Sequence, residues 1–363
     1  MTKQNETQSR ATPDGTKRFA ARFGERFVSS FYRSSAMGVS ISSLGLGTYL
    51  GESTDPDDYA YIAAVRHAIA SGINLIDTAI NYRCQRSERA LCSAIQQAVN
   101  AGDAARDELV ICSKAGYIPL DRSTPATKED YQSYVRREFV DSEIVQPSEI
   151  VGGGHSLAPR FLRYCLAKSR QNLGLRSIDL YYVHNPEQQL GYVAADELYS
   201  RLEAAFTVLE EAADRGEIGA YGIATWDGLR TAPQEPGHLS LERVVEAARR
   251  VGGAEHRLRA IQLPINLAMS EAVRAPTQLV NGHALTALQA AGELQLTVIG
   301  SATLMQARLA SGLPPALREH FSSLSTDAQR AIAFARTIEG VGASLVGMRQ
   351  SAHVDENLGA VRT

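Results

Sequence analysis

Four ionisable residues lie at or just beyond the ends of three apolar runs in this 363-residue chain. Asp77 ends INLID and Tyr82 follows five positions later, while Lys114 ends LVICSK and His184 ends IDLYYVH. Taken alone, Asp77 could cap the turn that follows it, and each of the other three is more often a packing or solvated residue than a catalytic one. The carboxyl ends of parallel strands meet on one face of a barrel, so we expect the four side chains to lie together.

These four residue types predict proton transfer to a carbonyl oxygen. A tyrosine hydroxyl titrates near pH 10, so an ammonium from Lys114 would be needed to lower the pKa of Tyr82. Asp77 would keep the buried lysine charged by pairing with it. His184 would orient the carbonyl, and Tyr82 would deliver the proton as a general acid. Since no side chain stores a hydride, the reaction would require a redox cofactor.

The order of the predicted elements explains how strand ends could meet. Continuous apolar runs, typical of parallel strands covered on both faces, alternate with segments of helical spacing. The predicted strands are Val39–Gly47, Ile73–Asp77, Leu109–Lys114, Ile178–His184, Ile218–Ala224, Ala260–Pro264, Leu296–Gly300 and Ala343–Val346. The predicted helices are Asp58–Ser71, Ser87–Val99, Pro159–Leu173, Glu197–Arg215, Leu241–Val251, Ala284–Ala291, Thr326–Ile338 and Val354–Val361.

This alternation predicts an α/β fold of the (β/α)₈ or TIM-barrel type rather than a doubly wound sheet. A doubly wound dinucleotide domain would need GxGxxG after its first strand, and Gly45–Gly51 reads GLGTYLG instead. We expect a mobile tail over residues 1–25 and one barrel domain over 26–363. Residues 115–157 form an unusually long connection after the third strand. We expect them to be either a lid or substrate loop, with Gly152–Gly154 as its hinge, or a surface excursion, in which the glycines only add flexible length.

Composition excludes several other classes of protein. The net charge is −3, and no basic run indicates nucleic acid. No apolar stretch is long enough to span a membrane, and the N-terminus has no signal-peptide core. The four cysteines form neither a CxxC pair nor a zinc-binding pattern, so we expect reduced thiols, a cytoplasmic location and no metal site.

From about residue 31 to the C-terminus the chain resembles the aldo-keto reductase superfamily. The specific features are DTAINY with the strand-end lysine and the YYVHNP segment. The resemblance implies a (β/α)₈ barrel that uses NADP(H) without a Rossmann fold and reduces a small-molecule carbonyl substrate. It also implies that Asp77, Tyr82, Lys114 and His184 form the family's catalytic tetrad.

The resemblance implies a cofactor site as well. Gly47 and Thr48 belong to the matching first-strand segment, and Gly347 would let the backbone approach the phosphates. Arg349 stands where the family places a cation for the 2′-phosphate, which favours NADP over NAD. Glu356 and Asn357 match the family's Glu-Asn pair, which contacts ribose and adenine.

The strand ends that would hold the nicotinamide depart from the family pattern. Ala224-Thr225 replaces the usual Ser-Asn pair, although Gln262 and Ser301 are kept. Gly300 replaces the aromatic residue that stacks on the ring, so Trp226 could take over the stacking.

The leading hypothesis is an NADPH-dependent reductase of an aldehyde or ketone, or the reverse oxidation. The alternatives are a non-redox enzyme and a nucleotide-sensing or partner-binding protein on the same barrel. Tyr49, Tyr117, Trp226 and Tyr131–Phe139 could line an apolar substrate pocket or pack the long loop down. The sequence specifies neither the substrate nor the oligomeric state.

Overall fold

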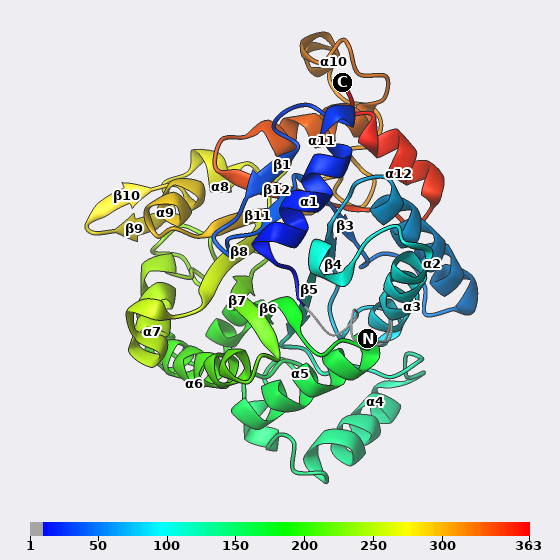
Figure 1. Cartoon of the computed structure of the whole chain (residues 1–363). Coiled ribbons are helices and arrows are strands. Elements are labelled where there is room, and N and C mark those ends of the chain that lie inside the picture. The colour runs from blue at the N-terminus through cyan, green and yellow to red at the C-terminus, as the bar shows by residue number, and fades with distance from the viewer. Residues whose placement is uncertain (1–9) are drawn as a thin grey trace.

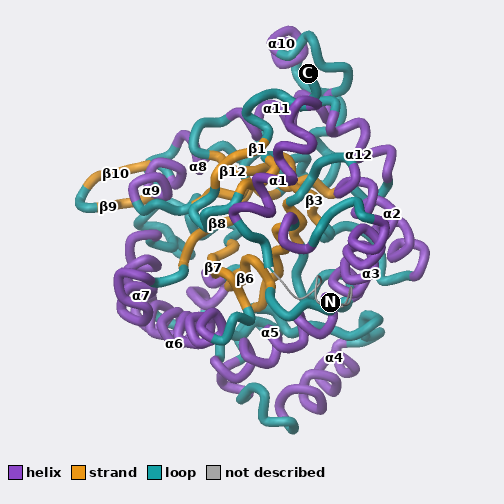
Figure 2. Tube along the Cα trace, viewed as in Figure 1, coloured by secondary structure: helices purple, strands orange, loops and turns teal. Residues whose placement is uncertain are grey.

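The chain folds as a closed barrel of parallel strands surrounded by helices, in a computed structural model that describes residues 10–363. The strand order around the barrel is β11-β12-β3-β4-β5-β6-β7-β8. Figures 1 and 2 show the strands at the centre and the helices α2, α3, α5, α6 and α7 around them. The predicted (β/α)₈ fold is confirmed.

The barrel strands are β3 (Leu44–Gly47), β4 (Leu75–Asp77), β5 (Val110–Ala115), β6 (Ile178–His184), β7 (Ile218–Ala224), β8 (Leu258–Pro264), β11 (Thr297–Ser301) and β12 (Val341–Gly347). The helices that follow them in turn are α2 (Asp55–Ala70), α3 (Arg86–Ala101), α5 (Pro159–Leu173), α6 (Ala195–Asp214), α7 (Leu241–Gly252), α9 (Ala287–Glu293), α11 (Asp327–Thr337) and α12 (Ser351–Leu358). Short helices at α8 (Glu271–Arg274) and α10 (Pro315–His320) lie within the last connections.

Two apolar layers hold the barrel together. Side chains such as Leu75, Leu180 and Tyr182 fill the barrel interior, and the other strand faces pack against the helices. Both faces are therefore buried, which explains why the strand sequences are continuously apolar. Among residues 10–363, no helix is both long and apolar enough to cross a bilayer.

The prediction of a mobile tail over residues 1–25 is wrong for Pro13–Phe23, which form helix α1; residues 1–9 lie outside the described part. Thr12 caps the helix by accepting a hydrogen bond from the Gly15 backbone N–H, and Pro13 occupies the first turn. The buried rings of Phe19 and Phe23 dock α1 across the N-terminal end of the barrel, in front of the strands in Figure 1.

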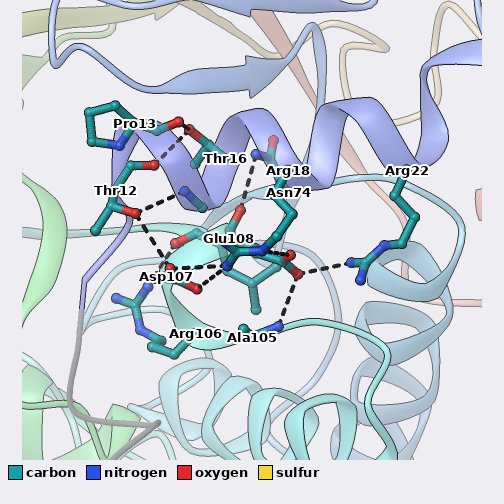
Figure 3. Close-up of polar contacts among 12 residues, drawn as sticks. Thr12, Pro13, Thr16, Arg18, Arg22, Asn74, Ala105, Arg106, Asp107 and Glu108 are labelled. Carbon is teal, nitrogen blue, oxygen red and sulfur yellow. Dashed lines mark hydrogen bonds and ion pairs between the residues drawn. The ribbon is translucent and has the colours of Figure 1, made fainter.

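Charged residues fasten α1 to the turn before β5, as Figure 3 shows. Arg18 pairs with Asp107 at 2.9 Å and with Glu108 at 3.1 Å, and Arg22 pairs with Glu108 at 2.9 Å. The Glu108 side chain is buried, whereas both arginines are largely exposed. Composition alone could not reveal these partners, because they are nearly ninety residues away in the sequence.

Two predicted elements are divided differently in the structure. The expected strand Val39–Gly47 breaks at Ser43, so that β2 (Ser40–Ser42) pairs antiparallel with β1 (Tyr32–Ser34) and only β3 enters the barrel. The expected helix Ala284–Ala291 begins later, because residues 283–285 form β10 (His283–Leu285), which pairs with β9 (Gln278–Val280).

The long connection after β5 carries its own secondary structure. It contains α4 (Lys128–Val135), a single π-helical turn (Arg136–Val140) and a 3₁₀ turn (Pro147–Glu149). The buried Phe139 packs on Phe161 and Tyr164 of α5. The aromatic segment Tyr131–Phe139 therefore packs this connection down and does not line the central cleft.

Candidate active site

The register of the barrel brings the predicted residues to one mouth. Gly347 pairs with Gly47, and Gly47 pairs with Asp77 on the next strand. On the other side of the barrel, His184 pairs with Ala224, and Ala224 with Gln262. These strand ends belong to different strand–helix units of the chain, so only closure of the barrel makes them neighbours.

Lys114 is fully buried and lies between the two groups that the sequence assigned to it. Its Nζ donates to Asp77 Oδ2 at 2.5 Å, to the Thr78 carbonyl at 2.9 Å and to Tyr82 Oη at 3.3 Å. Burial alone would lower the pKa of Lys114, but the Asp77 carboxylate and the hydrogen bonds to Asp77 and Tyr82 outweigh it and leave the pKa raised. The lysine is therefore an ammonium at neutral pH.

Gln262 completes this ion pair in a way that the sequence did not indicate. Its Nε2 donates to Asp77 Oδ1 at 2.9 Å, so that each carboxylate oxygen of Asp77 has a donor. Gln262 is buried on β8 and lines the cleft, where we expected it only as a cofactor contact. The resemblance found the residue, but not this second partner.

Tyr82 points its hydroxyl at Lys114 from a strained turn. Arg83, Cys84 and Gln85 directly after it all have positive φ, at 48°, 54° and 67°. Arg83 holds the turn by donating to the Glu52 carbonyl at 2.8 Å and to Asp58 at 2.5 Å. Such left-handed backbone persists only where surrounding contacts fix it. The Arg83 contacts thus hold the turn that directs the Tyr82 side chain.

The electrostatics of Tyr82 differ from the simple expectation that Lys114 lowers its pKa. Burial raises the pKa of Tyr82, the Lys114 ammonium opposes that rise, and the net direction is upward. The phenol is therefore protonated at neutral pH in the protein alone. A protonated phenol beside an ammonium is the form that a general acid needs.

His184 stands beside Tyr82 with a free ring nitrogen. The two rings lie 6.0 Å apart at 74°, and Tyr117 contacts His184 edge-on at 5.1 Å. Burial, Lys114 and His155 together hold the pKa of His184 well below its usual value, so the imidazole is neutral. Its buried Nδ1 has no hydrogen-bond partner among the described residues. A neutral imidazole donates one hydrogen bond, as required to orient a carbonyl oxygen.

His155 in the long connection is a site residue that the sequence analysis missed. Its Nε2 donates to the His184 carbonyl at 2.8 Å, and its Nδ1 accepts from Gln189 at 2.8 Å. Burial lowers the pKa of His155 to about 4. The backbone passes so closely here that a Cβ on Gly116 would come within 2.4 Å of the His184 carbonyl oxygen. The one sequence feature that could have pointed to His155 is its position directly after Gly152–Gly154, which form a tight turn.

Glu187 orders the segment after β7, which the sequence analysis singled out for its altered residues. Its Oε1 accepts from the backbone N–H of Trp226 at 2.6 Å and of Asp227 at 3.3 Å. Thr225 accepts from the Gly228 N–H at 2.9 Å, so its side chain caps this turn. Trp226 is 44% exposed and lines the cleft, where a flat ring could stack on it.

Asp77, Tyr82 and His184 line a cleft of about 910 Å³. One part is walled by the aromatic rings of Tyr49, Tyr82, Tyr117 and Trp226. The other predicted positions that line the cleft are Gly47, Thr48, Thr225, Gln262, Ser301, Gly347, Arg349, Glu356 and Asn357. The structure thus places every predicted site residue except Lys114 on the wall of this cleft, and Lys114 lies directly behind Asp77 and Tyr82.

The cleft has the features that a nicotinamide dinucleotide needs. A Cβ on Gly47 would meet only the Val346 backbone, at 3.8 Å, so the chain there leaves room for a close approach. Arg349 supplies a cation, while Glu356 and the buried Asn357 supply hydrogen-bonding groups at the same end. Within the described part of the chain, no three metal-ligating side chains cluster. Arg349, Glu356 and Asn357 are residue types that can bind the phosphate and hydroxyl groups of an organic cofactor.

Comparison with known proteins places the chain in a known family. The model of the aldo/keto reductase family matches residues 43–234. A D-threo-aldose 1-dehydrogenase from a Pseudomonas species is 29% identical over 214 residues, which are 55% of this chain and 55% of that protein. The NADH-specific methylglyoxal reductase of Escherichia coli K12 is 26% identical over 195 residues, which are 52% and 50% of the two chains. The chain thus spans about half the length of these curated relatives.

Solved structures share the fold at low sequence identity. An aldo/keto reductase from Klebsiella pneumoniae in complex with NADP and acetate superposes with a TM-score of 0.61 at 19% identity, covering 91% of this chain and 89% of that one. A second structure from Klebsiella pneumoniae, in complex with NADPH, gives a TM-score of 0.58 at 19% identity, with 93% and 89% covered.

Proposed function

This chain belongs to the aldo/keto reductase family, and we propose that it reduces an aldehyde or ketone to an alcohol, or catalyses the reverse reaction, with NADP(H). The observation that carries the proposal is the fully buried Lys114 ammonium, held between Asp77 and Tyr82 with a neutral His184 beside them. A protein that only binds a nucleotide has no need of such a charged pair, whose burial requires several compensating contacts.

Each of the four residues takes one role in the proposed reaction. His184 donates a hydrogen bond to the carbonyl oxygen and sets its position. Tyr82 gives its phenolic proton to the same oxygen as negative charge develops there, and Lys114 stabilises the phenolate that remains. Asp77 keeps Lys114 charged, and Gln262 satisfies the second oxygen of Asp77. In the oxidative direction, Tyr82 takes the proton back.

When bound, NADPH would supply the hydride for reduction, and NADP⁺ would accept it in the reverse direction. We assign the nicotinamide end of the cofactor to the part of the cleft near Gln262, Ser301 and Trp226, and its adenine end to the part near Arg349 and Asn357. Gly47 and Gly347 both line the cleft; a Cβ on Gly47 would meet only backbone at 3.8 Å, whereas a Cβ on Gly347 would lie 3.0 Å from the Leu50 side chain. These assignments rest on the lining of the cleft and on the family resemblance.

The substrate end of the cleft favours a neutral carbonyl compound. Its walls are Tyr49, Tyr117 and Trp226, and Asn81 adds a buried side-chain oxygen with no partner among the described residues. Aromatic walls suit an apolar or ring-shaped group next to the carbonyl. One curated relative is named for an aldose and the other for methylglyoxal. We therefore propose small aldehydes and aldoses as the first substrates to test.

The decisive experiment compares wild type with Tyr82→Phe. Trp226 is the chain's single tryptophan, so quenching of its fluorescence reports NADPH binding. Loss of the hydroxyl should reduce kcat by at least about 10³-fold with methylglyoxal or an aldose, in line with removal of a general acid. Because the ring stays in place, the Kd for NADPH should change less than about threefold. Retained turnover, or lost NADPH binding, would contradict the role given to Tyr82.

A further inference from the structure

The cation expected to bind the 2′-phosphate of NADP(H) already has an anionic partner. Arg349 Nη1 lies 2.7 Å from Asp57 Oδ1 and 2.9 Å from Asp57 Oδ2. The pair joins the loop after β12 to the first turn of α2, nearly three hundred residues apart in the sequence. In the described part of the chain, these are the only hydrogen bonds of the Arg349 guanidinium.

Asp57 is held firmly in that position. Its side chain is 14% exposed, compared with 40% for Arg349. The Glu52 backbone N–H also donates to Asp57 Oδ2, at 2.5 Å. Burial alone would raise the pKa of Asp57, but this bond and Arg349 outweigh it and lower the pKa. The carboxylate is therefore charged at neutral pH and fixed independently of Arg349.

The loop after β3 is shaped around the pair. Gly51 has φ of +105°, and a Cβ there would lie 2.6 Å from Asp57 Oδ2 and 3.5 Å from Arg349 Cδ. Gly51 and Arg349 both line the cleft. A ligand phosphate that approaches Arg349 must therefore bind within a few ångströms of a fixed carboxylate.

The charges at this end of the cleft suit a free ribose as well as a phosphorylated one. A 2′-phosphate carries close to two negative charges, and Asp57 both repels it and competes for Arg349 Nη1. Glu356 on the same wall can accept hydrogen bonds from ribose hydroxyls, which is how a carboxylate recognises the cofactor without the phosphate. Arg349 keeps its other nitrogens for the phosphate.

We propose that Asp57 sets the cofactor selectivity of this protein by partly neutralising Arg349, so that NADH binds nearly as well as NADPH. This inference rests on the proposed use of a nicotinamide cofactor and adds a residue that determines its selectivity. A charge-assisted bond from an arginine to a phosphate raises affinity roughly 10- to 100-fold. The competing carboxylate should remove most of this advantage, leaving the two Kd values within about tenfold of each other.

The test is a titration of the purified full chain with NADPH and with NADH by isothermal calorimetry, which does not depend on turnover. Asp57→Asn keeps the shape and the acceptor for the Glu52 N–H but removes the charge. We expect it to tighten NADPH binding by about five- to tenfold and to change NADH binding less than twofold. Asp55→Asn is the matched control, because Asp55 lies in the same turn but pairs with Arg86. It should leave the ratio of the two Kd values unchanged.

A double-mutant cycle tests whether Asp57 acts through Arg349. Arg349→Ala should weaken NADPH binding far more than NADH binding, and Asp57→Asn should have no further effect on selectivity in that background. Equal gains with and without Arg349 would overturn the inference, as would a loss of NADPH affinity in Asp57→Asn. If wild type binds neither cofactor, the proposed function itself fails. A wild type that binds NADPH more than a hundredfold tighter than NADH would refute the selectivity inference alone.

Discussion

Replacing Asp77 by asparagine removes one charge from a buried ion pair while it leaves Lys114 in place. Lys114 is fully buried, and its three hydrogen bonds to Asp77, Thr78 and Tyr82 include only one full counter-charge. Breaking a buried pair by removing one partner costs about 3–5 kcal/mol, because the remaining charge stays desolvated. We expect Asp77→Asn to lower the free energy of unfolding by that amount and to abolish turnover.

The double variant Asp77→Asn/Lys114→Met isolates the cause of this loss. It removes both charges and fills the lysine's space with an apolar side chain of similar length, so most of the lost stability should return, although activity stays absent. Urea denaturation of the wild type, the single variant and the double variant measures the three free energies. In this series the free energy of unfolding would recover in the double variant while turnover would not, because the proposed chemistry needs the Lys114 charge and the fold does not.

The pH dependence of Asp77→Asn gives a second check on the same reasoning. Without Asp77, burial would lower the folded-state pKa of Lys114 from its ordinary value of 10.5. The unfolded chain would then bind more protons than the folded one between these two values, so stability should rise with pH in this range. Equal stability of the single and double variants at pH 7, or no recovery at pH 10, would refute the proposal that an unpaired ammonium causes the loss.

Two further predictions concern residues outside the tetrad. The pKa of His155 is about 4 in the folded protein, compared with 6.5 ordinarily, so keeping it neutral contributes about 3 kcal/mol to the free energy of unfolding above pH 6.5, and this is lost as the pH falls toward 4. His155→Gln should therefore flatten this part of the pH–stability curve, as measured by urea denaturation. An unchanged slope would contradict the assignment. Phe19→Ala empties a fully buried site between α1 and the barrel and should cost about 3 kcal/mol in unfolding free energy. Because α1 covers the N-terminal end of the barrel, away from the cleft, kcat of the folded Phe19→Ala variant should stay within about twofold of wild type, and a larger loss would show that the two ends are coupled.

Local sequence patterns were enough to predict the barrel. The predicted strands are largely apolar runs, and the predicted helices carry apolar residues at helical spacing, so neighbouring residues alone predict both kinds of element. Pro159–Leu173, Ile178–His184 and Ile218–Ala224 have the predicted bounds. Helix α1 was missed because its apolar residues Phe19 and Phe23 are few among many polar ones. The reason for this segment to be helical is that these two rings pack on the end of the barrel, which the sequence does not show.

The residue types at the strand ends predicted the proposed chemistry, because acidity, basicity and charge are properties of single side chains. Asp77, Tyr82, Lys114 and His184 were found from their spacing and their family resemblance, and barrel closure brought them together.

Partners distant in the sequence were decided by the tertiary structure alone. The chain gives no local sign that Gln262 bonds to Asp77, that His155 holds the His184 backbone or that Asp57 pairs with Arg349. The direction of the pKa shift of Tyr82 also depends on how deeply the hydroxyl is buried, which the sequence does not state. Residue types thus determine which reaction is possible. Burial and non-local contacts, which only the tertiary structure supplies, determine the pKa of each ionisable group and the cofactor selectivity that we propose.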